Sequence, residues 1–164
     1  MRLPAVLHVL SLVLALFAAS MLVPLGVALA YGDGGQSAYA RSLGITLLAS
    51  AGLWAATRRA GRELQVRDGF LLVALVWTVL PAFATLPLLL QLPGLSFTDA
   101  YFEAVSGLTA SGATVLSGLD HLPPSLNIWR GFMIWLGGMG VIVLAVAILP
   151  LLGVGGMQLY KAET

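Results

Sequence analysis

The residues with the clearest potential for chemistry form a short run of small side chains, Thr109-Ala110-Ser111-Gly112. None of these side chains ionises, so the run can offer a ligand only backbone carbonyls and the hydroxyls of Thr109 and Ser111. Rings of carbonyl oxygens can replace the hydration shell of a potassium ion. Gly112 can adopt positive φ, which would help successive carbonyls to face one axis. These residues leave two interpretations open, a cation-binding strand and an interfacial loop that binds no ion.

A short helix is expected immediately before this run. Ser96 and Asp99 have the S-x-x-D spacing of a helix-capping pattern. The helix loosens at Gly107, so it is much shorter than the roughly 20 residues of a membrane span. Non-helical backbone at membrane depth must line a cavity or be buried in protein. A short helix and an irregular strand between two long apolar runs are therefore typical of a re-entrant pore loop, with the negative end of the helix directed at the strand.

The composition is that of an integral membrane protein. Of the 164 residues, 59% are hydrophobic and 9% are charged, whereas soluble domains carry about 25% charged residues. A net charge of +1 without a long basic run argues against nucleic acid as a partner. The sequence has no cysteine, and its two histidines, His8 and His121, are far apart. Since Asp99, Glu103 and Asp120 are not paired with a histidine at catalytic spacing, we expect neither a metal site nor an enzyme.

Four long apolar runs predict membrane-spanning helices. They cover about residues 3–30, 39–57, 69–91 and 125–149. The end of the first run, Val27-Ala28-Leu29-Ala30, resembles a signal-peptidase site, but the apolar stretch before it exceeds the roughly 7–15 residues of a signal peptide. We therefore expect a retained helix, with a cleaved signal peptide as the alternative.

Prolines predict the irregular points of these helices. Pro24 is expected to kink the first helix near its outer end. Pro81 and Pro87 are expected to kink the third helix, where neighbouring groups or the hydroxyls of Thr78 and Thr85 would satisfy the freed carbonyls.

Two further expectations concern the short helix before the strand. Gly137, Gly138 and Gly140 allow another backbone to approach the last helix closely, and we expect the short helix to pack there. Glu103 is expected to be structural rather than a permeation ligand. A buried carboxylate without a partner is costly, so it should bond to nearby backbone or face an outer vestibule.

The distribution of basic residues predicts the orientation. Arginine and lysine are enriched in cytoplasmic loops, and the one dense charge cluster lies at residues 58–68. With this cluster and both termini inside, six basic residues lie inside and two outside. The inside residues are Arg2, Arg58, Arg59, Arg62, Arg67 and Lys161, and the outside residues are Arg41 and Arg130. The pore loop then opens to the outside.

The second half of the chain also resembles a known family. The motifs are Glu103 to Leu116, Leu122-Pro-Pro-Ser-Leu followed by Trp129-Arg130, Trp135-Leu-Gly-Gly-Met-Gly140, and Ala147 to Thr164. They are similar to the TrkH potassium-uptake proteins of the Trk/Ktr/HKT superfamily. The resemblance is specific from about Asp99 onward and rests on hydropathy before that. Where the family's loop often reads T-T-T-G, this chain has T-A-S-G.

The resemblance implies an all-α integral membrane fold. Two leading transmembrane helices, residues 1–62, would precede the first potassium-channel-like helix–pore-loop–helix repeat, residues 63–164. In the family four such loops surround one axis, so this chain would supply one quarter of a filter for potassium ions, which are substrate, with no cofactor. The filter residues would be Thr109, Ala110, Ser111 and Gly112.

The resemblance also implies a setting and partners. The expected location is the bacterial inner membrane, with both termini cytoplasmic. The candidate partners are the other three repeats, a second copy in a homodimer, a cytosolic TrkA-like nucleotide-binding regulator and membrane lipid. Because the sequence contains one pore unit, we expect part of a longer transporter. The alternatives are a subunit of a homotetrameric cation channel and a non-conducting membrane assembly subunit, and an intramembrane enzyme is the least supported.

Overall fold

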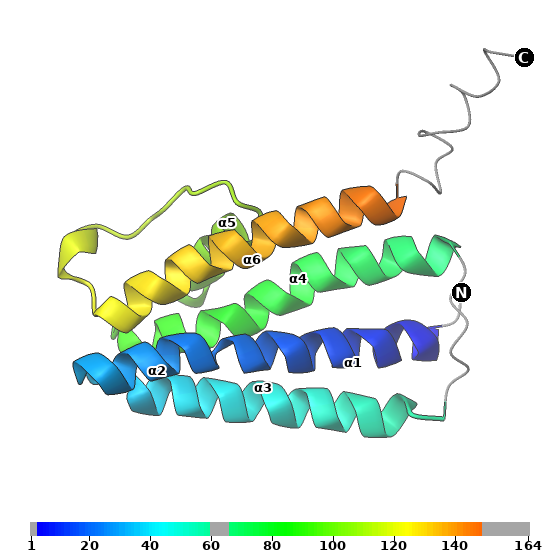
Figure 1. Cartoon of the computed structure of the whole chain (residues 1–164), viewed down its shortest axis with the longest axis horizontal. Coiled ribbons are helices and arrows are strands. Elements are labelled where there is room, and N and C mark those ends of the chain that lie inside the picture. The colour runs from blue at the N-terminus through cyan, green and yellow to red at the C-terminus, as the bar shows by residue number, and fades with distance from the viewer. Residues whose placement is uncertain (1–2, 60–65, 149–164) are drawn as a thin grey trace, which may run out of the picture.

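Long apolar helices that run side by side set the architecture (Figure 1). The computed structural model describes residues 3–59 and 66–148. The helices are α1 Leu3–Ser20, α2 Leu22–Tyr31, α3 Gln36–Thr57, α4 Val66–Gln91, α5 Phe97–Leu108, the short 3-10 helix η1 Leu119–His121, and α6 Pro124–Ile148. Within the described ranges, Leu3–Tyr31, Arg67–Gln91 and Pro124–Val143 are long and apolar enough to cross a membrane. The predicted all-α membrane fold is confirmed.

Some of the predictions fall on other parts of the chain. The predicted division at residues 62 and 63, the end of the last span at residue 149 and the family motif beyond it lie outside the described residues, as do Arg2, Arg62 and Lys161. Among the described elements, the starts of α1 and α4 lie at the same end of the bundle as the ends of α3 and α6 (Figure 1). The predicted alternation of the four long helices is therefore present.

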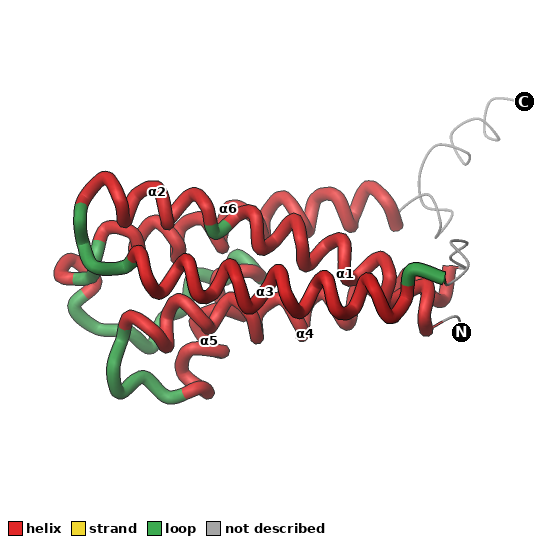
Figure 2. The backbone as a smooth tube through the Cα atoms, turned by 90° about the horizontal axis from the view of Figure 1, so that it is seen from below, coloured by secondary structure: helices red, strands yellow, loops and turns green. Residues whose placement is uncertain are grey.

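The second predicted span, α3, is long enough to cross a membrane but more polar than the other three. It has 22 residues and lies beside α1 (Figures 1 and 2). Its hydroxyl residues Ser42, Thr46, Ser50 and Thr57 are buried. The Ser50 hydroxyl donates a hydrogen bond to the Ser11 carbonyl of α1 at 2.7 Å. Small polar residues let membrane helices approach closely and form hydrogen bonds across the interface. These hydroxyl side chains of α3 are therefore buried between helices rather than exposed on the surface of the bundle.

The first predicted span is interrupted once, at Met21. A proline ring clashes with the carbonyl four residues earlier and cannot donate to it, which for Pro24 is the carbonyl of Ser20. Helix α1 ends at Ser20, and α2 begins at Leu22. The Met21 amide bonds the Ala18 carbonyl, only three residues back, at 3.0 Å. The predicted kink is confirmed.

Pro81 and Pro87 lie inside α4 without ending it. The hydroxyls of Thr78 and Thr85 donate to carbonyls of the preceding turn, at 2.9 and 2.6 Å. Those carbonyls are not the ones that the prolines leave free, which belong to the residues four positions before each proline. The expectation that these threonines replace the missing bonds is therefore wrong.

The loosened turns of α4 instead receive donors from neighbouring helices. The Tyr101 hydroxyl of α5 donates to the Thr78 carbonyl at 3.1 Å. The Trp129 indole nitrogen of α6 donates to the Ala84 carbonyl at 3.2 Å. Both bonds lie next to a proline-disturbed turn, so the prolines mark where the pore unit attaches to α4.

Trp129 joins the leading helices to the pore unit. Its side chain is completely buried. Its ring centroid lies 5.7 Å from that of Phe17 in α1 and 6.4 Å from that of Tyr39 in α3, within the range of favourable aromatic pairs. One side chain of α6 therefore contacts α1, α3 and α4 together.

The turn between α2 and α3 attaches to the start of α6. The Asp33 carboxylate accepts hydrogen bonds from the amides of Gly35 at 3.0 Å and Ser125 at 2.8 Å. Partial burial opposes ionisation, but these hydrogen bonds outweigh it and lower the pKa of Asp33 from its usual value. The charged carboxylate thus sits at the N-terminus of α6, where the helix dipole favours negative charge.

Gly137 of α6 lies against the end of α5. A Cβ at this position would lie 1.9 Å from the carbonyl oxygen of Leu108, the last residue of α5. A Cβ at Gly138 or Gly140 would meet no described atom within 4 Å. The expected close approach to the short helix is confirmed for Gly137 and is not found for the other two glycines.

We predict that Gly137→Ala displaces the end of α5 and destabilises the protein, since overpacking costs about 1–3 kcal/mol or more. Gly138→Ala is the matched control because it adds the same methyl group one residue away without a clash. The measurement is the thermal unfolding midpoint in detergent of full-length proteins that carry each change. Equal midpoints for the two variants would contradict the close approach.

Candidate functional site

Helix α5 is started by the expected capping residues. The Ser96 hydroxyl accepts a hydrogen bond from the Asp99 amide at 3.1 Å and donates one to the Asp99 carboxylate at 2.8 Å. The capping pattern predicted from the sequence is therefore confirmed. Helix α5 has only 12 residues and packs between α4 and α6, so its C-terminal end stops partway along the bundle.

After α5 the chain returns as an extended strand toward η1, on the opposite side of the bundle from α3 (Figure 1). Residues 109–115 are all exposed. Thr109 has φ −87°, whereas Ala110 has φ +56° and Gly112 has φ +73°. Positive φ at Gly112 is as predicted. Positive φ at Ala110 is not foreseen by the sequence, because residues other than glycine rarely adopt it.

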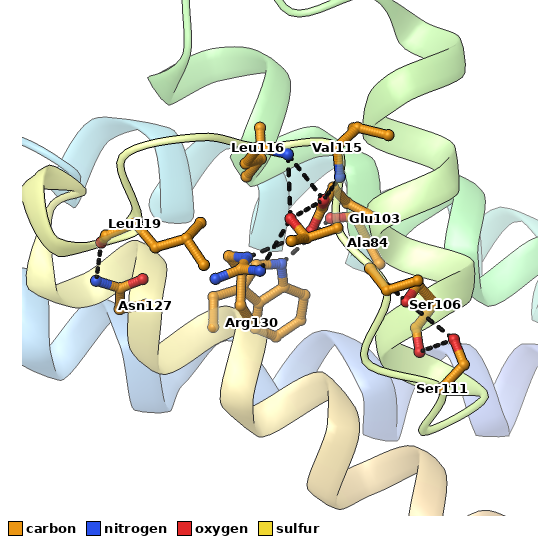
Figure 3. A network of polar contacts seen from close by, with 12 residues as sticks. Ala84, Glu103, Ser106, Ser111, Val115, Leu116, Leu119, Asn127 and Arg130 are labelled. Atoms are coloured by element: carbon orange, nitrogen blue, oxygen red, sulfur yellow. Dashed lines mark hydrogen bonds and ion pairs between the residues drawn. The ribbon is translucent and has the colours of Figure 1, made fainter.

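Ser106 of α5 holds this strand from behind (Figure 3). Its carbonyl accepts hydrogen bonds from the amides of Ser111 at 3.0 Å and Gly112 at 3.5 Å. Its hydroxyl donates to the Ala113 carbonyl at 2.5 Å and lies 3.0 Å from the Ser111 hydroxyl. Ser106 is 4% exposed and its partners in the strand are exposed, so these bonds form a partly buried attachment between α5 and the strand.

The direction of these amides sets the direction of the carbonyls before them. In a planar trans peptide, the C=O points opposite to the N–H of the following residue, and the described chain has no cis peptide. The amides of Ser111 and Gly112 point at Ser106. The carbonyls of Ala110 and Ser111 must therefore point away from α5, toward the exposed side of the strand.

The carbonyls of Thr109 and Ala113, on either side of these two, point in different directions. The Ala110 amide bonds the Gly107 carbonyl of α5 at 2.9 Å, so the Thr109 carbonyl also points away from the helix end. The Ala113 carbonyl turns back to the Ser106 hydroxyl. The outward set contains three successive carbonyls, those of residues 109–111.

The hydroxyls of the strand are not oriented as ligands. The Thr109 hydroxyl donates to the Val105 carbonyl of its own helix at 2.8 Å. The Ser111 hydroxyl lies against Ser106. Among the described residues, no group of three or more histidine and acidic side chains could hold a metal ion. Backbone carbonyls are therefore the groups that the strand presents to a ligand.

Glu103 of α5 holds the part of the strand that follows. It is 3% exposed. Its Oε1 accepts hydrogen bonds from the Val115 amide at 2.7 Å, the Leu116 amide at 3.3 Å and the Thr114 hydroxyl. Its Oε2 accepts one from Nε of Arg130 at 3.3 Å (Figure 3). The backbone partners expected for this carboxylate are confirmed.

Arg130 and Ser106 are the two residues that sequence reasoning missed. Arg130 lies on α6, 27 residues after Glu103, and its Nη2 also donates to the Thr114 hydroxyl at 3.2 Å. A buried carboxylate requires a partner, and Arg130 is a cation in the span that follows Glu103 in the sequence. These two facts together could have indicated the pair from the sequence. Ser106 lies three residues after Glu103 and so on the same face of α5.

Comparisons with known proteins show the family to which this chain belongs. The family model described as TrkH, cation transport protein, matches residues 35–164. The chain belongs to the TrkH family. The crystal structure of the potassium transporter TrkH from Vibrio parahaemolyticus matches with a TM-score of 0.88 and 48% identity, covering 95% of this chain and 34% of that one.

Curated relatives of the TrkH family match nearly the whole chain. The Trk system potassium uptake protein TrkH of Vibrio parahaemolyticus is 49% identical over 164 residues, 99% of this chain and 34% of the relative. TrkH of Escherichia coli K12 is 48% identical over the same shares. TrkG of that strain is 38% identical over 96% of this chain and 33% of the relative. The chain spans about a third of the length of these relatives, and the likeness extends to the leading helices, where the sequence offered hydropathy alone.

We predict that Ser106→Ala destabilises the loop. It removes the hydrogen bond to the Ala113 carbonyl, a net loss of about 0.5–1.5 kcal/mol for an ordinary hydrogen bond of an exposed residue. Ser117→Ala is the control because Ser117 lies exposed in the same loop. Thermal midpoints in detergent and rubidium uptake should both fall for Ser106→Ala in a full-length protein and stay unchanged for Ser117→Ala. Identical behaviour of the two variants would refute the attachment.

Proposed function

We propose that this chain supplies one pore loop to a potassium uptake protein, and that the ion passes along the backbone oxygens of Thr109, Ala110, Ser111 and Gly112. The observation that carries the proposal is the set of carbonyls at residues 109–111 that point away from α5, fixed by amide bonds to Gly107 and Ser106. Oxygens arranged in this way can replace water around an ion that carries a single charge. The role is transport rather than catalysis.

One strand cannot surround an ion, so further loops are needed. Residues 109–115 are exposed along their whole length, although they lie beside helices suited to span a membrane. Backbone at that depth requires protein or a water-filled cavity around it. Three more loops would cover the exposed face and complete the ring. The relatives, which are named potassium uptake proteins, are about three times as long as this chain.

The proposed location is a bacterial inner membrane. In the proposed orientation the loop faces the outside, and the end of α3 and the start of α4 face the cytoplasm. Arg58 and Arg59 directly follow α3, and Arg67 lies in the first turn of α4, which fits the excess of basic residues on the cytoplasmic side. A homodimer and a cytosolic nucleotide-binding regulator remain partners implied by the family resemblance, and the regulator would meet this basic end.

The central test uses a hybrid transporter in which these 164 residues replace the matching N-terminal part of Escherichia coli TrkH. Gly112→Ser should lower the preference for rubidium over sodium, because a Cβ at φ +73° forces the strand to rearrange. Gly118→Ser is a matched control, since Gly118 also has positive φ, +66°, but lies beyond the strand.

Uptake of rubidium with and without competing sodium is the measurement, at matched membrane abundance. The hybrid should support growth on limiting potassium, and Gly118→Ser should keep the ion preference. An unchanged preference in Gly112→Ser would sink the filter assignment, as would an equal change in both variants.

The orientation has its own test, which is simplified by the absence of cysteine from the sequence. Single changes Ser37→Cys, Asp120→Cys and Arg59→Cys place thiols at exposed positions in a hybrid free of other cysteines. An impermeant maleimide should label the first two in intact cells and the third only after the membrane is opened. Labelling of Arg59→Cys in intact cells would reverse the orientation.

A further inference from the structure

We propose that Glu103 and Arg130 are positioning residues for ion selectivity, acting together as a clamp on the segment after Gly112. The proposal rests on the proposed function, because it assigns a role to residues that touch the filter strand and not the ion. Neither side chain belongs to the strand itself, since Glu103 is in α5 and Arg130 is in α6.

The clamp acts on peptide orientation. Glu103 accepts hydrogen bonds from the amides of Val115 and Leu116, at 2.7 and 3.3 Å. By the planarity of the trans peptide, the carbonyls of Thr114 and Val115 then point away from Glu103. Glu103 therefore does for the outer part of the strand what Ser106 does for the inner part.

Packing gives the strand little support where these two attachments meet. A cavity of about 20 Å³ lies behind it, enough for about one water molecule. The lining residues are Glu103, Ser106, Gly107, Gly112, Ala113, Arg130, Met133 and Ile134. The backbone of Gly112 and Ala113 borders this cavity, so their hydrogen bonds to Ser106 hold it in position. Loss of the outer attachment would leave the strand next to Gly112 with the Ser106 attachment alone.

Arg130 makes the clamp rigid because it uses two nitrogens on two acceptors. Nε donates to Glu103 at 3.3 Å and Nη2 donates to the Thr114 hydroxyl at 3.2 Å. Thr114 donates in turn to Glu103, which closes a ring of three side chains. A lysine ammonium carries the same charge but lacks the planar fork that fits two fixed acceptors. Charge alone therefore does not reproduce the clamp.

The position of Arg130 is itself fixed by its neighbour in α6. Trp129 is completely buried among aromatic rings of α1 and α3, so α6 cannot rotate freely. The Arg130 side chain is 18% exposed and the Glu103 side chain 3%, which places the pair at the edge of the interior rather than in open solvent. An ion pair held there is suited to transmit the position of α6 to the strand.

The test compares Arg130→Lys with Asp120→Asn in the full-length hybrid transporter. Arg130→Lys should lower the preference for rubidium over sodium roughly tenfold, the effect expected from losing one charge-assisted hydrogen bond, at near-normal membrane abundance. Asp120→Asn removes an exposed charge from η1 and should leave the preference unchanged. An unaltered preference in Arg130→Lys at normal abundance would show that the pair only stabilises the fold, and would overturn the proposal.

Two further measurements keep the test decisive. Should Arg130→Lys fail to reach the membrane, Thr114→Val decides, because Thr114 is exposed and its change removes one member of the ring. It should shift the preference in the same direction by a smaller factor, and no shift would overturn the proposal. A double-mutant cycle is the second measurement. The double variant with Glu103→Gln and Arg130→Gln should lose less selectivity than the single variant Arg130→Gln. The single variant leaves the buried Glu103 carboxylate without its cation.

Gly112→Ser, measured in parallel, separates this proposal from the proposed function. If Gly112→Ser changes the ion preference and Arg130→Lys and Thr114→Val do not, only the clamp is wrong. If Gly112→Ser changes nothing, the filter assignment itself has failed.

Discussion

Non-helical backbone at membrane depth has to find hydrogen-bond partners within the protein, and the whole pore unit follows from that requirement. Residues 109–116 leave the helix and lose its regular pairing, so each amide that faces inward must be met by a neighbour. Ser106 meets those of Ser111 and Gly112, and Glu103 meets those of Val115 and Leu116. The carbonyls on the other side of the same peptides are thereby left to face outward. The hydrogen bonds that satisfy these amide donors therefore also set the direction of the carbonyl oxygens.

The rest of the bundle holds α5 where it can provide those partners. Gly137 brings α6 against the last carbonyl of α5, and Trp129 anchors α6 to α1, α3 and α4. Prolines in α4 loosen turns that then accept bonds from Tyr101 and Trp129. The leading helices contribute no group to the strand among the described residues, and their effect on it passes through α4 and α6.

Local features were predictable from the sequence, and contacts between distant residues were not. The capping by Ser96, the kink before Pro24 and positive φ at Gly112 each depend on residues a few positions apart, where backbone sterics decide the outcome. The pairing of Glu103 with Arg130 depends on how α5 and α6 pack, which no local pattern contains. Positive φ at Ala110 was missed because the bonds that close the end of α5, from the amides of Ala110 and Ser111 to the carbonyls of Gly107 and Ser106, outweighed the preference of alanine.

The separation of Glu103 and Arg130 along the chain has a consequence for biogenesis. Glu103 enters the membrane with α5, but its cation follows 27 residues later on α6. Until α6 is inserted, the carboxylate has no counterion in the pore unit and is expensive to bury. The nascent short helix should therefore stay near a membrane surface until α6 is inserted. The helix that follows the strand in the chain, α6, would thus be the one that gives the strand its final shape.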